Sequence, residues 1–126
     1  MSPVVPIAAR RRHETPAGVM TTLASPTLGA TTRLSLWEVA MAAGASGPLH
    51  TIDSEQIWTL FEGEIAITVG ERREVLRPGD TLAVAGGVGR QVQATTDARL
   101  LVCGNGDAVA SVPGQPTPLG TPPWIA

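Results

Sequence analysis

The sequence predicts an all-β domain, built as a sandwich or a small barrel. From Arg33 onward, short segments rich in Val, Ile, Leu, Thr and Trp alternate with Gly and Pro, a pattern typical of strands joined by tight turns. No segment sustains helical periodicity for three turns between these breakers. The chain of 126 residues has room for one compact core, so we expect one domain with terminal extensions.

The N-terminal part, residues 1–26, is expected to form an arm outside the barrel. Its densest basic cluster is Arg10–Arg12, which has no aromatic residues interleaved with it. A solvated arm is therefore favoured over a nucleic-acid contact. The piece "VMTTLA", residues 19–24, has a composition suited to an added edge strand.

The barrel is expected over residues 27–110, in the segments "RLSLWEVAM", "EQIWTLFEGEIAITVG", "REVLRPGDTLAVAGG" and "RQVQATTDARLLVCG". In "FEGE", Gly63 fits a tight hairpin with a positive φ, and in "RPGD", Pro78 and Gly79 suit the two central positions of a type II turn. Strands point every second side chain to the same face. A shared interior is therefore expected for His50, Ile52, Gln56, Trp58, Arg90 and Val92.

The C-terminal tail, residues 111–126, carries Pro and Gly too densely for a central strand. It is expected to run extended over the surface. Trp124 and Ile125 are apolar, so we expect them to dock on the barrel or on a partner subunit. Cys103 is the single cysteine and is expected to be a buried strand thiol without a catalytic role.

Composition excludes several function classes. The net charge is −2 and all nine basic residues are arginines, which gives no field suited to nucleic acid. The chain contains no lysine and no tyrosine, so it cannot perform Schiff-base chemistry or phenolic acid catalysis. Phosphate-loop, nucleophile-elbow and zinc-spacing motifs do not occur. Without a signal-peptide core or an apolar run of membrane-spanning length, a soluble, cytoplasmic protein is expected.

Two stretches, "GPLHTIDSEQIWTLFEGEIAITVG" and "LRPGDTLAVAGGVGRQVQA", resemble the two motifs of the cupin superfamily. The resemblance covers residues 33–103, and "LFEGE" and "LRPGDTL" are its most specific pieces. It implies a jelly-roll barrel, also called a double-stranded β-helix. The family's four metal-ligand positions fall on His50, Ile52, Gln56 and Arg90.

Of these four residues, only His50 is a good metal ligand. Ile52 has no donor atom, Gln56 offers a weak neutral oxygen, and Arg90 brings a permanent positive charge. The resemblance therefore implies a degenerate metal motif, and no cofactor is expected. The alternative is a divalent metal bound through His50 and Glu55, which requires a register slip that also turns Trp58 outward.

Three residues are candidates for catalysis: His50, Gln56 and Arg90. His50 is either a general base or an inert core histidine. The Arg90 guanidinium requires a partner inside the barrel, either Glu38 or Asp53 in an internal ion pair or an anionic substrate. Gln56 either holds a substrate carbonyl and orients His50, or satisfies Arg90.

Five residues are candidates for substrate binding: Ile52, Trp58, Trp37, Met41 and Glu38. The two tryptophans and Met41 serve either as pocket walls or as plain core. Glu38 faces solvent if Trp37 and Val39 are core, and it enters the barrel in the opposite register, where it would fix the His50 tautomer.

The first functional hypothesis is a small, homodimeric cupin that converts an organic acid or carbonyl compound without metal. Isomerase, cyclase or lyase chemistry fits because it requires only a base and a cradle for an enolate oxygen. The alternatives are a non-catalytic protein that binds or senses a small ligand, and a metal-dependent cupin oxygenase. The partners expected are a small molecule and a second copy of the chain, without nucleic acid or membrane.

Overall fold

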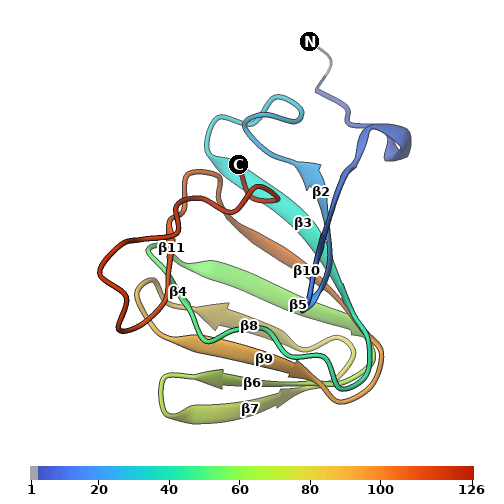
Figure 1. Cartoon of the computed structure of the whole chain (residues 1–126). Coiled ribbons are helices and arrows are strands. Elements are labelled where there is room, and N and C mark those ends of the chain that lie inside the picture. Colours follow the sequence, from blue (N-terminus) through green and yellow to red (C-terminus); the bar gives the residue numbers. More distant parts are fainter. Residues whose placement is uncertain (1–2) are drawn as a thin grey trace.

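The computed structural model describes residues 3–126 and is almost entirely β-structure (Figure 1). One short 3-10 helix, η1 (Ile7–Ala9), precedes the strands. The strands are β1 (Arg11–Thr15), β2 (Gly18–Ala24), β3 (Leu34–Met41), β4 (Thr51–Ile52), β5 (Gln56–Glu62), β6 (Ile65–Val69), β7 (Arg72–Leu76), β8 (Thr81–Val84), β9 (Arg90–Ala94), β10 (Ala98–Asn105) and β11 (Ala110–Ser111).

The strands form two facing sheets. One has six strands in the order β1-β2-β3-β10-β5-β8, and the other has the order β7-β6-β9. The strand pair β11-β4 lies beside the second sheet, because backbone bridges join Ser46 to Gln93 and His50 to Arg90. All these pairings are antiparallel. This arrangement confirms the predicted jelly-roll barrel.

The core lies between the two sheets because the strands alternate as the sequence predicts. On β5, Gln56, Trp58 and Leu60 are buried, whereas Ile57 and Phe61 are exposed. Leu60 and Ile67 come from opposite sheets and are both 0% exposed. This alternation turns one face of each sheet into the interior.

The "RPGD" turn between β7 and β8 has the predicted type II geometry. Gly79 has a φ of 94°, and the Asp80 N–H donates to the Arg77 carbonyl at 2.9 Å. The Asp80 side chain accepts from the Arg77 N–H at 2.8 Å. Gly63 also has a positive φ, 81°, and a Cβ there would collide with the Asp97 carbonyl. Both predicted glycine roles are confirmed.

The N-terminal part contributes two strands to the larger sheet. Strands β1 and β2 form a hairpin, and β2 pairs with β3. Arg11 departs from the expectation of a solvated arm. Its guanidinium donates to the Ala126 carbonyl at 2.6 Å and to the Ser25 hydroxyl at 3.3 Å. The side chain therefore connects the hairpin to the tail.

The tail crosses the open end of the barrel and returns to the hairpin (Figure 1). Ile125 is 2% exposed and belongs to the main core, with Trp124 packed against it. The Thr22 hydroxyl donates to the Trp124 carbonyl at 2.6 Å, and the Ser25 hydroxyl donates to the Ala126 carbonyl at 2.7 Å. The end of the tail is thus held by both packing and hydrogen bonds.

Cys103 is half-buried rather than buried, because it lies on the outward-facing side of β10. Its cross-strand neighbours are Leu36 and Ile57, and Ile57 is exposed. Within residues 3–126, no helix has the length and hydropathy needed to cross a membrane.

Candidate active site

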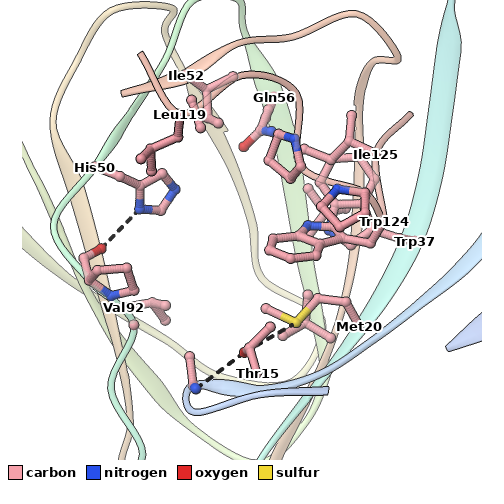
Figure 2. A pocket seen from close by; sticks show the side chains of 18 of the residues that line it. Thr15, Met20, Trp37, His50, Ile52, Gln56, Val92, Leu119, Trp124 and Ile125 are labelled. Carbon is pink, nitrogen blue, oxygen red and sulfur yellow. Dashed lines mark hydrogen bonds between the residues drawn. The ribbon is translucent and has the colours of Figure 1, made fainter. Parts of the chain in front are cut away.

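A cavity of about 700 Å³ lies between the sheets and beneath the tail (Figure 2). This volume is in the range of pockets that bind small organic molecules. The barrel strands supply one side of the lining. The other side comes from two covering segments, residues 15–20 of the hairpin and residues 119–125 of the tail. All three tryptophans of the chain, Trp37, Trp58 and Trp124, line the cavity.

His50 reaches the cavity from the segment that precedes β4. Its backbone is fixed by two hydrogen bonds with Arg90, from the His50 N–H at 3.1 Å and from the Arg90 N–H at 2.9 Å. The imidazole Nδ1 lies 2.9 Å from the Pro48 carbonyl oxygen. Because a carbonyl only accepts, Nδ1 carries the proton, and Nε2 of the neutral ring is left as an acceptor.

The surroundings of His50 keep its imidazole neutral. Burial lowers the pKa of His50, the hydrogen bond to the Pro48 carbonyl opposes this shift, and the positive charge of Arg90 adds to the lowering. The net pKa lies below the usual value of 6.5. A neutral imidazole at physiological pH is able to accept a proton.

Gln56, the first residue of β5, points its amide into the barrel and is 3% exposed. Its Oε1 accepts two hydrogen bonds, from Trp58 Nε1 at 3.1 Å and from Arg90 Nη1 at 3.2 Å. These two donors fix the orientation of the amide, since only oxygen can accept them. Gln56 also lines the cavity, and no described residue accepts a hydrogen bond from its Nε2.

Arg90 is fully buried but does not line the cavity. Four hydrogen bonds occupy its guanidinium, with acceptors at the Val88 carbonyl (3.2 and 3.1 Å), the Ala85 carbonyl (3.0 Å) and Gln56 Oε1. Burial lowers the pKa of Arg90, yet an arginine stays charged. Arg90 therefore touches a lining residue only by its hydrogen bond to Gln56, and its charge reaches His50 without a direct contact between the two side chains.

The internal ion pair with Glu38 or Asp53, one of the two alternatives for Arg90, does not form. Glu38 lies on the outward face of β3 and pairs with Arg99 at 3.1 Å. Asp53 accepts from the Val109 N–H at 2.9 Å. The Ala85 and Val88 carbonyls, in the loop before β9, accept the guanidinium's hydrogen bonds in place of a carboxylate.

The predicted binding residues fall into two groups. Ile52, Trp58, Trp37 and Met41 line the cavity, whereas Glu38 does not. Glu38 alternates with Trp37 and Val39, which both face inward, so it is excluded from the site by the register of β3. Glu55 is exposed, so the register slip that would bring it inward does not occur.

Several lining residues were missed by the sequence analysis as site residues. They come from the covering segments and include Thr15, Met20, Leu119, Pro122, Trp124 and Ile125. The only signal in the sequence was the apolar pair Trp124 and Ile125. It indicated that the tail docks on another surface, but not which surface. Figure 2 shows Trp124 and Met20 on the side of the cavity opposite His50, with Thr15 at its lower boundary.

The residues at the four metal-ligand positions do not fit a metal ion. His50 offers one free nitrogen, Ile52 offers none, and Oε1 of Gln56 is already occupied by two donors. The fourth position holds the Arg90 cation, which repels a metal. Among residues 3–126, no group of three or more His, Cys, Asp or Glu side chains is arranged to hold one.

Solved structures share this fold at low sequence identity. An RmlC-like cupin from Shewanella frigidimarina is 19% identical, with a TM-score of 0.70 over 81% of this chain and 88% of that chain. A gentisate adduct of salicylate 1,2-dioxygenase from Pseudoaminobacter salicylatoxidans is also 19% identical, with a TM-score of 0.71. A variant of oxalate decarboxylase from Bacillus subtilis is 15% identical, with a TM-score of 0.72.

The match covers 83% of this chain against the dioxygenase and 82% against the decarboxylase, but only 31% and 29% of those longer chains. These likenesses show the fold alone. No curated protein matches the sequence. The family model of the cupin domain matches residues 37–104, more than half of the chain, which includes His50, Gln56 and Arg90. The protein therefore belongs to the cupin family.

Proposed function

We propose that this cupin binds a small carbonyl compound and moves a proton on it without a metal, as an isomerase, cyclase or lyase. His50 is the general base, and Gln56 holds the carbonyl oxygen. The single observation that carries the proposal is the pair of fixed, opposite hydrogen-bonding groups in one cavity. Both residues line the cavity, and His50 Nε2 can only accept a hydrogen bond, whereas Gln56 Nε2 can only donate one and has no partner among the described residues.

The proposed step is a balanced proton transfer. His50 Nε2 takes a proton from the carbon next to the carbonyl, the C–H electron pair forms the new C=C bond, and the π pair of the C=O bond moves onto the oxygen. The imidazolium then returns the proton to a different carbon, or the enolate closes a ring or expels a leaving group. The Gln56 N–H groups stabilise the oxyanion while it exists.

Arg90 supports this step as a positioning residue. Its hydrogen bond to Gln56 Oε1 holds the amide in place and draws electron density toward that oxygen. Hydrogen bonds in such a chain strengthen one another, so the Nε2 protons become better donors to an enolate. This role replaces the direct substrate contact that the sequence suggested for Arg90.

Metal independence is part of the proposal and is supported by the donor set rather than by any missing ion. Only His50 among the four ligand positions keeps a free donor atom, whereas structural and catalytic metal sites require at least about three protein ligands. Elemental analysis of purified protein tests this point. Stoichiometric iron, nickel, manganese or zinc whose removal abolishes activity would overturn it.

Hydrogen–deuterium exchange on 1-adamantyl methyl ketone tests the catalytic part of the proposal. This ketone is apolar and can exchange only its methyl protons, which NMR follows directly in D2O. The wild type is expected to accelerate the exchange above buffer, and His50→Gln to abolish the acceleration while the protein still binds the ketone. Equal exchange by both proteins would refute His50 as the base.

The second candidate is a protein that binds or senses a small ligand without converting it. The apolar lining and the tail across the cavity favour capture. Tight binding of the ketone by the wild type, with no His50-dependent exchange, would favour this candidate over catalysis. The homodimer and the cytoplasmic location stay predictions, and analytical ultracentrifugation tests the first of them.

A further inference from the structure

We infer that the substrate is an uncharged, mainly apolar carbonyl compound, held with its oxygen on Gln56 and its acidic C–H or O–H toward His50. The substrate class rests on the proposed function, because the two polar contacts are the proposed base and oxyanion donor. On sequence alone, the substrate was either an organic acid or a carbonyl compound. The proposed class retains the carbonyl compound and excludes the organic acid.

The first step concerns charge. Among the described residues that line the cavity, His50 is the only ionisable one. The nearest cation, Arg90, is fully buried behind the lining, and four of its five N–H groups are already bonded to neutral acceptors. A carboxylate in this cavity would lose its hydration without gaining a cationic partner, so the cavity disfavours organic acids.

The second step concerns the polar atoms of the two residues proposed to contact the reacting group. Gln56 presents only donors, since its oxygen is occupied, and neutral His50 presents only an acceptor. A ligand that satisfies both needs one acceptor and one acidic hydrogen, which an enolisable carbonyl group provides. Figure 2 shows the two side chains pointing into the same cavity from different elements. A hydrocarbon would satisfy neither of them, and an ammonium ion, which has only donors, would satisfy only His50.

The third step concerns the body of the ligand. The rest of the lining is mainly aromatic and aliphatic, with Trp37, Trp58 and Met41 from the barrel and Met20 and Trp124 from the covering segments. In a cavity with such walls, burial of the ligand's apolar surface is the main driving force for binding. A cavity of about 700 Å³ is large enough for a ring system rather than for a two- or three-carbon metabolite.

A matched pair of probes tests this class. 1-Adamantyl methyl ketone and 1-adamantanecarboxylate have the same apolar body and differ in charge. Because all three tryptophans line the cavity, their fluorescence reports binding. At pH 8, where His50 is neutral, the ketone is expected to bind at least about tenfold more tightly than the carboxylate. Equal or tighter binding of the carboxylate, or no saturable binding of the ketone, overturns the inference.

A charge-adding variant provides a test that does not depend on the buried hydrogen bonds. Ser46 is exposed and lies at the cavity lining, so Ser46→Lys adds a cation without disturbing the core. It is expected to raise the affinity for the carboxylate several-fold and to leave the ketone affinity unchanged. If the carboxylate gains nothing, charge does not select ligands in this cavity and the inference fails.

The two proposals fail in different ways. Preferential binding of the ketone without His50-dependent exchange retains the substrate class and removes the catalytic function. His50-dependent exchange together with preferential binding of the carboxylate retains the base and removes the substrate class.

Discussion

The two sides of the cavity differ in both origin and chemistry. The barrel side carries His50 and Gln56, and these residues lie within the matched cupin domain, residues 37–104. The covering segments, residues 15–20 and 119–125, lie outside that match and contribute no ionisable side chain to the lining. The barrel therefore supplies the proposed reactive groups together with apolar walls, while the terminal regions close the space with further apolar walls. If the proposed function holds, the reactive groups come from one part of the chain and the cover over the ligand from another.

The largest expected effects are losses of folding stability when one core residue is truncated in the barrel and one in the tail. Ile67→Ala removes a fully buried side chain from β6 and is expected to lower the free energy of unfolding by about 4 kcal/mol. Ile125→Ala, at 2% exposure in the tail, is expected to cost only about 2 kcal/mol, because the tail can detach while the barrel stays folded. Urea unfolding of both variants measures the difference.

Amide hydrogen exchange identifies the reason for that difference. The Leu119 N–H donates to the Ala110 carbonyl at 2.8 Å and reports tail docking. Ile125→Ala should accelerate exchange at Leu119 without accelerating it in β6. If both variants accelerate all core amides alike, the tail unfolds with the barrel and the two sides form one cooperative unit.

Trp124→Ala tests whether the tail shapes the ligand. Trp124 is a half-buried wall of the cavity, so its removal should weaken binding of 1-adamantyl methyl ketone about tenfold, or about 1.4 kcal/mol. Trp124→Phe is the matched control and should retain most of the affinity. Isothermal titration measures both. An unchanged dissociation constant for the alanine variant would show that the barrel alone defines the site.

The sequence predicted the barrel side better than the covering side, for a physical reason. Alternation on β4 and β5 determines which side chains face inward, so Ile52, Gln56 and Trp58 could be placed from the pattern, whereas the register of Trp37 on β3 was left open. A Pro-rich tail has no such period. Trp124 was identified as needing a docking place, but no pattern indicated that it would form a wall of the cavity.

Arg90 shows a second limit of sequence reasoning. Its strand position correctly implied burial, but neither of the two acidic candidates, Glu38 and Asp53, pairs with it, and backbone carbonyls accept its hydrogen bonds instead. A long side chain can reach the backbone of its own preceding loop, and sequence patterns do not reveal which carbonyls turn inward there. Glu38 shows a related limit, since the alternation left two registers open and only the structure shows the outward one, in which Glu38 pairs with Arg99.

Thr22→Val tests the hydrogen bonds that hold the tail. Thr22 is 0% exposed, and its hydroxyl donates to the Trp124 carbonyl. Valine keeps the shape but leaves that carbonyl without its donor, so the free energy of unfolding should fall by about 1 kcal/mol. Thr59→Val, which removes a solvent-exposed hydroxyl pair with Thr81, should change it by less than about 0.5 kcal/mol. If Thr22→Val and Thr59→Val lower the free energy of unfolding equally, the hydrogen bond from Thr22 to the Trp124 carbonyl does not stabilise the tail.

The smallest expected effect is the pH dependence contributed by His50. Its pKa in the folded protein is below the usual 6.5, mainly through burial. As the pH falls below 6.5, the unfolded chain binds a proton that folded His50 does not yet accept, so stability decreases with falling pH. The loss begins near pH 6.5 and ends at the lower, folded pKa. Above pH 6.5 this contribution is fully present.

The difference between the wild type and His50→Gln isolates this contribution, because the carboxylates titrate alike in both proteins. Urea unfolding between pH 5 and 8 should give a difference that is constant at high pH and shrinks toward acid. The exchange activity should follow the same protonation, with a midpoint below pH 6.5, since the protonated imidazole cannot act as the base. A midpoint above 6.5 would mean that a negative group faces His50, which would also reverse the expected preference for uncharged ligands.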